Sequence, residues 1–237
     1  MSALPNDYDS DPGRFLSAEK HPHDDVHPYV AARFAAAGAR TVLDVGGGNG
    51  RLARLLPGMF MRCLLIDLSP TMLDLAPRPS VRADGTRLPV ADASVDAVAA
   101  LYTLYHYTDP LVPIREARRV LRPGGLFAAC AANRDTDPEL AQVIPGWGAA
   151  SPFDGEDAEA IVASVFDAPG DTVEVDPWDG PLVTLSSVPD AVACLRVYGF
   201  GATAAASAAA TLDLPLTLTK RGCVVYAAKA PHQDTAA

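Results

Sequence analysis

The apolar residues of this chain form short continuous runs that alternate with segments of helical periodicity. Uninterrupted apolar runs predict strands that are buried on both faces, as in a parallel sheet. The predicted strands are 40–45, 61–66, 80–83, 95–101 and 126–131, and the predicted helices between them are 51–56, 70–76 and 111–121. This alternation predicts a doubly wound α/β sheet with right-handed crossovers.

The flanks of this core follow a different pattern. We expect an N-terminal arm (1–25) that includes a short helix at 13–20, then a helix at 25–37. After residue 132, the expected elements are an irregular segment (133–156), helices at 156–166, 189–198 and 202–212, and extended pieces at 172–175, 182–185 and 216–219. The residues Lys220-Arg221-Gly222 predict a turn before a closing strand at 223–228.

These elements predict a single domain over residues 1–237. Its parts are an N-terminal arm or lid (1–25), a ligand-binding core (38–132), two substrate-side insertions (133–156 and 188–215) and a tail (231–237). A chain of this length is sufficient for one sizeable hydrophobic core.

Charge and cysteine content narrow the functional class. The formal net charge is −10, and no cluster of Lys and Arg is present, which argues against nucleic acid and anionic membranes as partners. The N-terminus has no apolar segment typical of a signal peptide, and no run is long enough to span a membrane. The four cysteines are widely spaced, which favours free thiols in a reduced, cytoplasmic protein.

A histidine cluster in the arm raises the question of a metal. His21, His23 and His27 lie near two aspartates, but Pro22 and Pro28 interrupt the regular spacing that a metal-binding helix needs. No metal site is therefore expected.

The most informative stretch is a glycine-rich turn directly after the first predicted strand. It has the spacing Asp44-x-Gly46-x-Gly48-x-Gly50. Glycine permits positive φ and lets a ligand approach the main chain, and the next helix directs free N–H groups toward it. The turn therefore predicts a nucleotide-like ligand. Residues 48–53 also fit the dinucleotide fingerprint, so NAD(P) remains an alternative.

Three acids favour a ligand without phosphate. Asp44 ends the first strand, where it would repel a diphosphate, and Asp67 and Asp84 end the second and third strands. Carboxylates around one crevice suit a ligand that carries a cation, a ribose diol and an exocyclic amine.

Residues 40–132 resemble class I S-adenosylmethionine-dependent methyltransferases, in the small-molecule group similar to the ubiquinone and menaquinone biosynthesis enzymes. The resemblance rests on five motifs in order, at 42–50, 66–73, 83–89, 96–98 and 119–125. It implies a Rossmann-like seven-stranded sheet of order 3-2-1-4-5-7-6, with the last strand antiparallel and inserted between strands five and six.

The resemblance also implies S-adenosylmethionine as cofactor and assigns roles to individual residues. The glycines Gly46, Gly48 and Gly50 would surround the amino-acid part, with Asp44 near its ammonium group. Asp67 would bind the ribose and Leu68 would pack on the adenine. The remaining assignments are Asp84 to the adenine amine, Gly85 to a ring nitrogen and Leu101 to the methionine part.

Candidate catalytic residues follow the fourth strand. Methyl transfer is an in-line displacement that depends mainly on orientation, and a weak nucleophile also needs a base. His106 is the candidate base because its ordinary pKa is near neutrality, although a structural role is the competing interpretation. Tyr102 and Tyr105 are expected to form the pocket wall rather than to act as catalysts. In the insertions, Trp147 and Phe153 are candidates for an aromatic lid.

The expected activity is methyl transfer to an oxygen, nitrogen or carbon atom of a small molecule. Two alternatives stay open: a protein of the same fold that binds the cofactor for non-methylating chemistry, and an NAD(P)-dependent oxidoreductase. A homodimer is one possible assembly.

Overall fold

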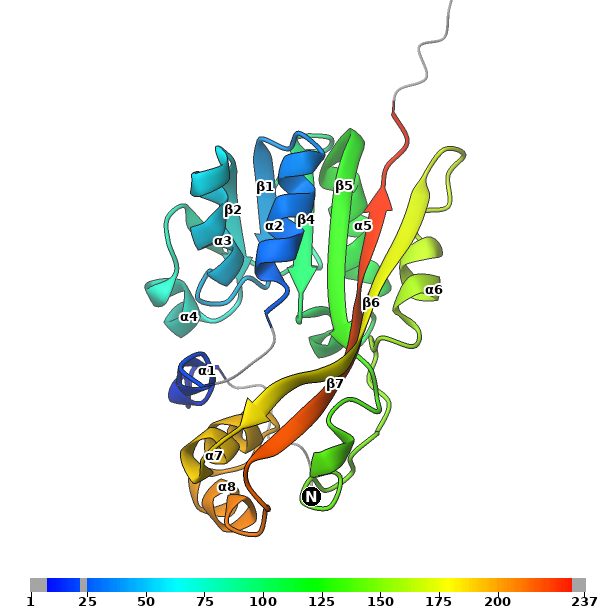
Figure 1. The fold of residues 1–237 in the computed structure, drawn as a ribbon. Helices are drawn as coiled ribbons and strands as arrows, with labels where there is room; N and C mark the ends of the chain where they lie inside the picture. The colour runs from blue at the N-terminus through cyan, green and yellow to red at the C-terminus, as the bar shows by residue number, and fades with distance from the viewer. Residues whose placement is uncertain (1–7, 22–24, 232–237) are drawn as a thin grey trace, which may run out of the picture.

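The computed structural model describes residues 8–21 and 25–231. Its seven-stranded sheet has the order β3-β2-β1-β4-β5-β7-β6, in which β7 is antiparallel to both of its neighbours (Figure 1). This confirms the predicted order. The strands are β1 (Thr41–Val45), β2 (Arg62–Asp67), β3 (Ser80–Arg82), β4 (Val95–Leu101), β5 (Leu121–Ala132), β6 (Thr172–Leu185) and β7 (Leu216–Ala228).

Helices cover both faces of the sheet. The α-helices are α1 (Gly13–Ala18), α2 (His27–Ala36), α3 (Arg51–Leu55), α4 (Pro70–Leu75), α5 (Leu111–Val120), α6 (Ala158–Ala163), α7 (Val188–Val197) and α8 (Ala202–Ala209). Three short 3-10 helices are η1 (Leu56–Met59), η2 (Leu104–His106) and η3 (Pro138–Leu140). The helix predicted to stop before Pro57 therefore continues as η1. In the described residues, no helix is long and apolar enough to cross a membrane.

Two apolar clusters hold the helices to the sheet. On one face, Val30 and Phe34 of α2 pack with Val42 of β1. On the other face, Ile114 of α5 and Val162 of α6 pack in the same cluster as the central strands. The central strands are buried on both faces, which is the reason for their continuous apolar runs.

The last two strands differ from the prediction. Segments 172–175 and 182–185 are parts of one strand, β6, and Lys220-Arg221-Gly222 lies inside β7 rather than in a turn. Gly222 pairs with Trp178 across the ladder. A Cβ at Gly222 would lie 2.4 Å from the Trp178 ring, so glycine is required there by close packing and not by a change of chain direction.

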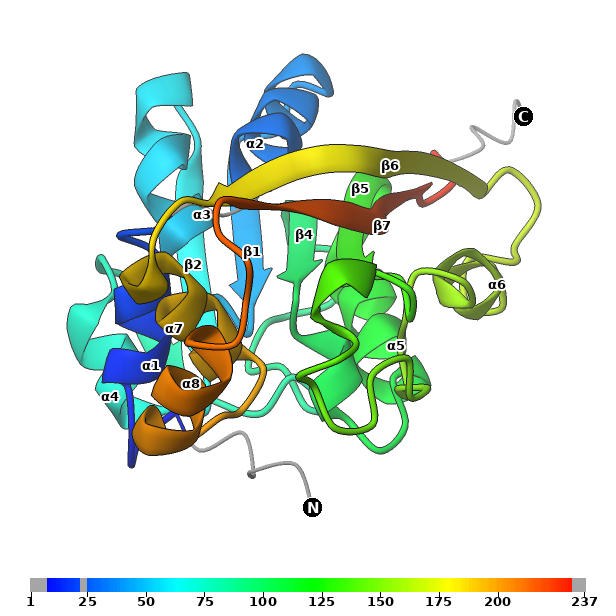
Figure 2. The same ribbon diagram turned by 60° about the horizontal axis from the view of Figure 1, so that its bottom comes forward.

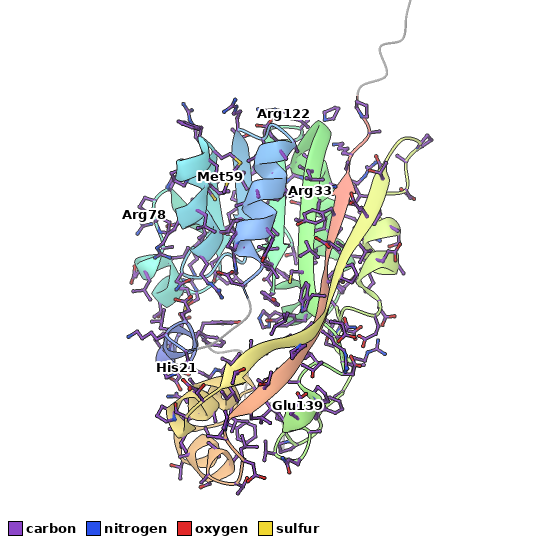
Figure 3. The ribbon with its side chains drawn as sticks, in the orientation of Figure 1. His21, Arg33, Met59, Arg78, Arg122 and Glu139 are labelled. Carbon is purple, nitrogen blue, oxygen red and sulfur yellow. The ribbon has the colours of Figure 1, made fainter. Side chains whose placement is uncertain are left out.

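The β6–β7 pair extends beyond the sheet and carries a helical cap (Figures 1 and 2). The cap consists of α7, α8 and η3, which share a separate apolar cluster with Leu185 of β6 and Leu218 of β7. Glu139 of η3 lies beside β7 (Figure 3) and accepts hydrogen bonds from the Thr219 N–H at 3.0 Å and from its hydroxyl. The cap is thereby fixed to the strand pair.

The helix α1 connects the N-terminal residues to this cap. His21 (Figure 3) has its Nδ1 2.7 Å from an Asp190 carboxylate oxygen of α7, and Arg196 of α7 pairs with Asp11. The same region also contacts the core, where the Glu19 carboxylate accepts a hydrogen bond from the Asn49 side chain at 3.0 Å. The N-terminal arm thus joins the core to the cap.

Candidate functional site

A cavity of about 890 Å³ lies at the carboxyl ends of the parallel strands. Open α/β sheets bind ligands at this edge. Eight of the residues predicted from the sequence line this cavity, which we call the cleft: Gly46, Gly48, Asp67, Leu68, Asp84, Gly85, Tyr102 and His106. Segments distant in sequence therefore meet at one place.

The glycine turn has the backbone that the sequence predicts. Gly46, Gly48 and Gly50 have φ values of 66°, 56° and 87°, which side chains rarely allow. A Cβ at Gly46 would also lie 2.1 Å from Thr103 Oγ1. Gly50 begins α3 and does not line the cleft; a Cβ there would lie 2.4 Å from Pro77 Cδ. Backbone shape thus favours glycine at all three positions, and close packing also requires it at Gly46 and Gly50.

Asp67 is held by backbone groups on both sides. Its carboxylate accepts hydrogen bonds from the N–H groups of Gly48 and Ser69, each at 2.8 Å. Ser69 in turn caps α4, since its Oγ accepts from the Met72 N–H at 3.1 Å. The carboxylate is therefore oriented in advance, at the rim between the glycine turn and the end of β2.

Asp44 lies beneath the turn and does not line the cleft. Its side chain is buried, with 2% exposure, and its Oδ2 has no hydrogen-bond partner among the described residues. Burial, and secondly the negative charge of Asp67, raise the pKa of Asp44 to about 7. A buried carboxylate oxygen without a partner suits a nearby positive charge.

Asp84 and Gly85 follow β3 at the other side of the cleft. The Asp84 carboxylate accepts from the Thr86 N–H at 2.9 Å, and a Cβ on Gly85 would lie 2.4 Å from the Tyr107 hydroxyl oxygen. Burial, followed by the charges of Asp84 and Asp67, raises the pKa of Tyr107 to about 12. Sequence reasoning did not identify Tyr107, although its position in the segment after β4 was an available signal.

His106 lies in the cleft and is paired with an aromatic residue from the N-terminal region. Its Nε2 is 2.8 Å from the hydroxyl oxygen of Tyr8, whose ring stacks on Phe15 at 4.1 Å. Burial, and secondly the positive charge of Arg14, lower the pKa of His106 to about 4. The imidazole is therefore neutral at pH 7, and it is a weaker base than an ordinary histidine. No specific pattern in the sequence identifies Tyr8.

Four further candidate residues do not line the cleft. Tyr105 packs against the main core cluster and not in the cleft, and burial raises its pKa well above the ordinary value for tyrosine. Leu101 is buried in the cluster on the α2 face, and Phe153, with 1% exposure, belongs to the core rather than to a lid. Trp147 donates a hydrogen bond from its indole to the Thr136 carbonyl at 3.0 Å. Apolar residues next to a pocket often pack inward, which sequence alone does not distinguish.

In the part of the chain that the structure describes, no group of three or more His, Cys, Asp or Glu side chains could hold a metal ion. His21 and His27 form separate pairs with Asp190 and Asp25. His23 lies outside the described residues.

Comparisons with known proteins show similarity to methyltransferases. Residues 43–129 match the family described as a methyltransferase domain. Over 127 residues the chain is 39% identical to an uncharacterized methyltransferase of Mycobacterium sp. (strain KMS), covering 49% of each protein. Over 116 residues it is 38% identical to a ubiquinone biosynthesis O-methyltransferase of Xanthomonas campestris, covering 45% of this chain and 48% of the relative. The chain thus spans about half the length of the curated relatives it matches.

Solved structures resemble the whole fold. The YcgJ protein from Bacillus subtilis has a TM-score of 0.62 at 17% identity, covering 87% of this chain and all of the other. The [4+2]-cyclase SpnF has a TM-score of 0.67 at 19% identity, and the match covers 97% of this chain and 96% of SpnF. At these identities the similarity concerns the fold alone. The methyltransferase match favours S-adenosylmethionine over the dinucleotide alternative.

Proposed function

We propose that the protein transfers a methyl group from S-adenosylmethionine to a small molecule, in agreement with the match of residues 43–129 to a methyltransferase domain. The acceptor atom is an oxygen, nitrogen or carbon nucleophile. The observation that carries the proposal is the meeting of the glycine turn, Asp67 and Asp84 around one cavity.

The proposed roles follow the chemistry of each group. The glycine turn surrounds the amino-acid part of the cofactor, and the buried carboxylate of Asp44 attracts the ammonium group. Asp67, already oriented by two backbone N–H groups, accepts from the ribose hydroxyls. Leu68, which is 54% exposed, offers an apolar surface to the adenine. Asp84 accepts from the adenine amine, beside the Gly85 N–H.

The bound cofactor supplies a methyl group that its sulfonium centre has already activated. The protein then contributes mainly orientation and exclusion of water. His106 remains a proposed base, but a pKa of about 4 limits it to accepting a proton from an acidic nucleophile. Residues 133–156 and 188–215, together with the arm, are proposed to shape the acceptor side.

One alternative remains on a specific observation. The solved neighbour titled a [4+2]-cyclase shares this fold, and a fold does not determine its chemistry. That alternative predicts cofactor binding without formation of S-adenosylhomocysteine from any acceptor.

The test is calorimetric titration with S-adenosylhomocysteine. Asp67→Asn keeps the size of the side chain but removes its charge, and we expect at least a ten-fold weaker affinity, which is about 1.4 kcal/mol. Asp213→Asn, at an exposed position outside the cleft, is the matched control and should bind like the wild type. Equal affinity of Asp67→Asn and the wild type would refute the assignment.

A further inference from the structure

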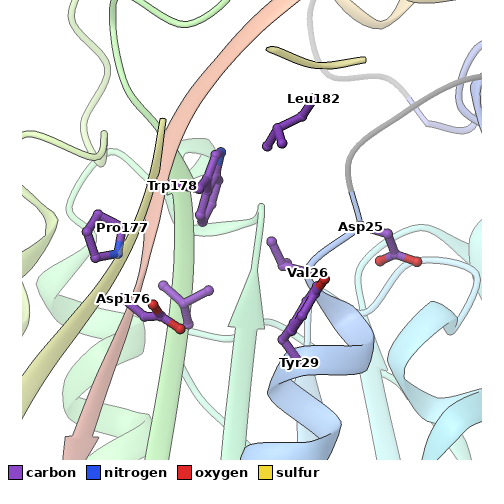
Figure 4. A pocket seen from close by; sticks show the side chains of 8 residues that line it. Asp25, Val26, Tyr29, Asp176, Pro177, Trp178 and Leu182 are labelled. Carbon is purple, nitrogen blue, oxygen red and sulfur yellow. The ribbon is translucent and has the colours of Figure 1, made fainter. Parts of the chain in front are cut away.

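The acceptor of the proposed reaction has to lie in the same cavity as the glycine turn. A second cavity, of about 400 Å³, lies between the start of α2 and the strand β6 (Figure 4). It shares no lining residue with the cleft, so nothing in its wall connects it with the glycine turn. The acceptor therefore belongs in the cleft, where Tyr8, Tyr102 and His106 form the wall contributed by the arm and by the segment after β4.

The cleft has two sides of opposite electrostatic character. On the side of β2 and β3, burial, followed by the negative charges of Asp84 and Asp67, raises the pKa of Tyr107 to about 12. On the side of the arm, burial, followed by the positive charge of Arg14, lowers the pKa of His106 to about 4. An anionic group of a ligand is therefore favoured beside His106 and disfavoured beside Tyr107.

The positive charge on the arm side comes from Arg14 of α1, a helix that packs against α7 of the cap (Figure 2). Arg14 is 5% exposed, and within residues 8–21 and 25–231 its Nε has no hydrogen-bond partner and its guanidinium has no ion pair. The guanidinium carbon lies 4.4 Å from the centre of the Phe15 ring, a contact that compensates the charge only in part. Buried charges are normally paired, so Arg14 indicates an anion that the described residues do not supply.

The Tyr8–His106 pair connects this charge to the cleft. Phe15 stacks on Tyr8 with 4.1 Å between the ring centres, and the Tyr8 hydroxyl oxygen lies 2.8 Å from His106 Nε2. Burial, followed by the charge of Asp67, raises the pKa of Tyr8 to about 12, and the charge of Arg14 opposes this shift. Tyr8 therefore keeps its proton, and His106 is neutral at pH 7. Such a pair can donate a hydrogen bond to an acceptor but does not readily remove a proton from one.

We propose that the methyl acceptor is a small molecule that binds beside Tyr8 and His106 as an oxyanion, either a carboxylate or an acidic phenolate. The inference rests on the proposed function and adds the chemical class of the acceptor. Arg14 does not line the cleft, and it selects the charge of the acceptor through the Tyr8–His106 pair.

The chemistry of the transfer fits this class. A lone pair of the oxyanion forms the bond to the methyl carbon, and the C–S electron pair stays on the sulfur. The positive charge of the sulfonium and the negative charge of the acceptor are both neutralised, and no proton has to be removed. A neutral His106 beside the acceptor is therefore sufficient, since its role is to orient the oxyanion.

Three probes of similar size but different charge test the proposal: benzoate, benzyl alcohol and benzylamine. The chain has five histidines, and the imidazole NMR signal that disappears in His106→Gln identifies the reporter of the site. With S-adenosylhomocysteine bound, we expect benzoate to shift this signal and to bind about ten-fold more tightly than benzyl alcohol, because hydrogen bonds to a charged group are the stronger ones. Benzylamine should bind more weakly than either.

A cationic cofactor analogue tests whether the probe lies beside the reacting centre. Sinefungin carries an amine at the position of the methylated sulfur. The positive charge of this amine should strengthen benzoate binding relative to the complex with S-adenosylhomocysteine and should leave benzyl alcohol binding nearly unchanged. Equal benzoate affinity in the two complexes would place the anion away from the methyl group and would overturn the inference.

Matched variants locate the charge effect. Arg14→Met keeps an apolar side chain of similar length but removes the charge, and it should abolish the preference for benzoate over benzyl alcohol. Arg14→Lys keeps the charge and should retain the preference; its loss in both variants would overturn the inference. Arg62→Met removes an exposed arginine at the start of β2, outside the cleft, and should behave like the wild type.

Cofactor binding in the same proteins separates the two proposals. Arg14→Met should bind S-adenosylhomocysteine and 5′-methylthioadenosine, which lacks the amino-acid part, as tightly as the wild type does. Weaker binding of S-adenosylhomocysteine alone would show that Arg14 serves the carboxylate of the cofactor, and it would overturn the inference.

The remaining outcomes are equally decisive. Equal binding of the three probes, no detectable binding of benzoate, or a benzoate preference that persists in Arg14→Met would overturn the inference. Normal S-adenosylhomocysteine affinity without a preference for the anion overturns the acceptor class alone. Failure of S-adenosylhomocysteine to bind the wild type overturns the proposed function itself.

Discussion

Replacing Asp44 by Asn tests how the structure treats a buried carboxyl group beneath the glycine turn. The pKa of Asp44 is raised from 3.8 to about 7, so the folded protein keeps a proton that the unfolded chain loses above pH 4. The stability contributed by this group is complete below about pH 4 and is lost as the pH rises through 7. Asp44→Asn has no titrating carboxyl group at this position, so its free energy of unfolding should lack this decrease with rising pH.

The size of the effect follows from the shift. One pKa unit is worth about 1.4 kcal/mol. Relative to its full value below pH 4, the stabilisation by Asp44 is therefore reduced by about 1.7 kcal/mol at pH 5 and by roughly 4 kcal/mol at pH 8. Through Asp44, the wild type should therefore lose roughly 2.5 kcal/mol of its free energy of unfolding between pH 5 and pH 8. Asp44→Asn should lack this loss, and it should be the more stable protein at pH 8.

Urea unfolding at pH 5, 6.5 and 8 measures this difference. Asp213→Asn, which removes an exposed carboxylate, is the control and should keep the wild-type pH dependence. The reasoning is refuted if Asp44→Asn and the wild type show parallel curves. A functional consequence can be measured as well: if the ammonium of the cofactor lies near Asp44, binding at pH 7 should release a proton, which appears as a buffer-dependent enthalpy in calorimetry.

Three further predictions concern packing, catalysis and capping. Gly222→Ala should destabilise the protein by about 1–3 kcal/mol in thermal unfolding, because its Cβ would lie 2.4 Å from the Trp178 ring; Gly58→Ala, at an exposed position with no atom within 4 Å of the added Cβ, should not, and equal effects would contradict this. Because the pKa of His106 is lowered to about 4, the rate of methyl transfer should not change around pH 6.5 through titration of this residue. A rise in rate near pH 6.5 that is present in the wild type and lost in His106→Gln would contradict this. Ser69→Ala should cost about 1 kcal/mol in urea unfolding through the lost N-cap of α4, and an unchanged midpoint would refute it.

The sequence was most informative where one local signal determined the structure. The apolar run of β4 was predicted with the bounds observed, because from Ala97 to Leu101 burial on both faces leaves no polar position to confuse the pattern. Ser69-Pro70 was identified as the start of α4, and the Ser69 hydroxyl does accept from the Met72 N–H. The order of the strands came from the family resemblance, since local patterns do not determine which strands pair.

The prediction was weakest where long-range packing overrides local signals. Lys220-Arg221-Gly222 has the composition of a turn, but thirteen register pairs hold it and its neighbours in the β6–β7 ladder. Tyr8 reaches His106 from 98 residues away in the sequence. No local pattern in the sequence indicates a contact over this distance, so His106 could be predicted but its partner Tyr8 could not.

Two titrating groups, His106 in the cleft and Asp44 beneath the glycine turn, bear on the roles of protein and cofactor in the proposed reaction. Burial favours the neutral form of each group, since it lowers the pKa of His106 to about 4 and raises that of Asp44 to about 7. A neutral imidazole bonded to Tyr8 is suited to position a nucleophile and poorly suited to remove a proton from an alcohol. Asp44, in contrast, has a pKa of about 7, so a cation that binds near it at neutral pH would favour its deprotonated, negatively charged form. In the proposed reaction the protein would therefore act mainly by orienting the reactants, and the buried carboxylate beneath the glycine turn would favour a positively charged cofactor.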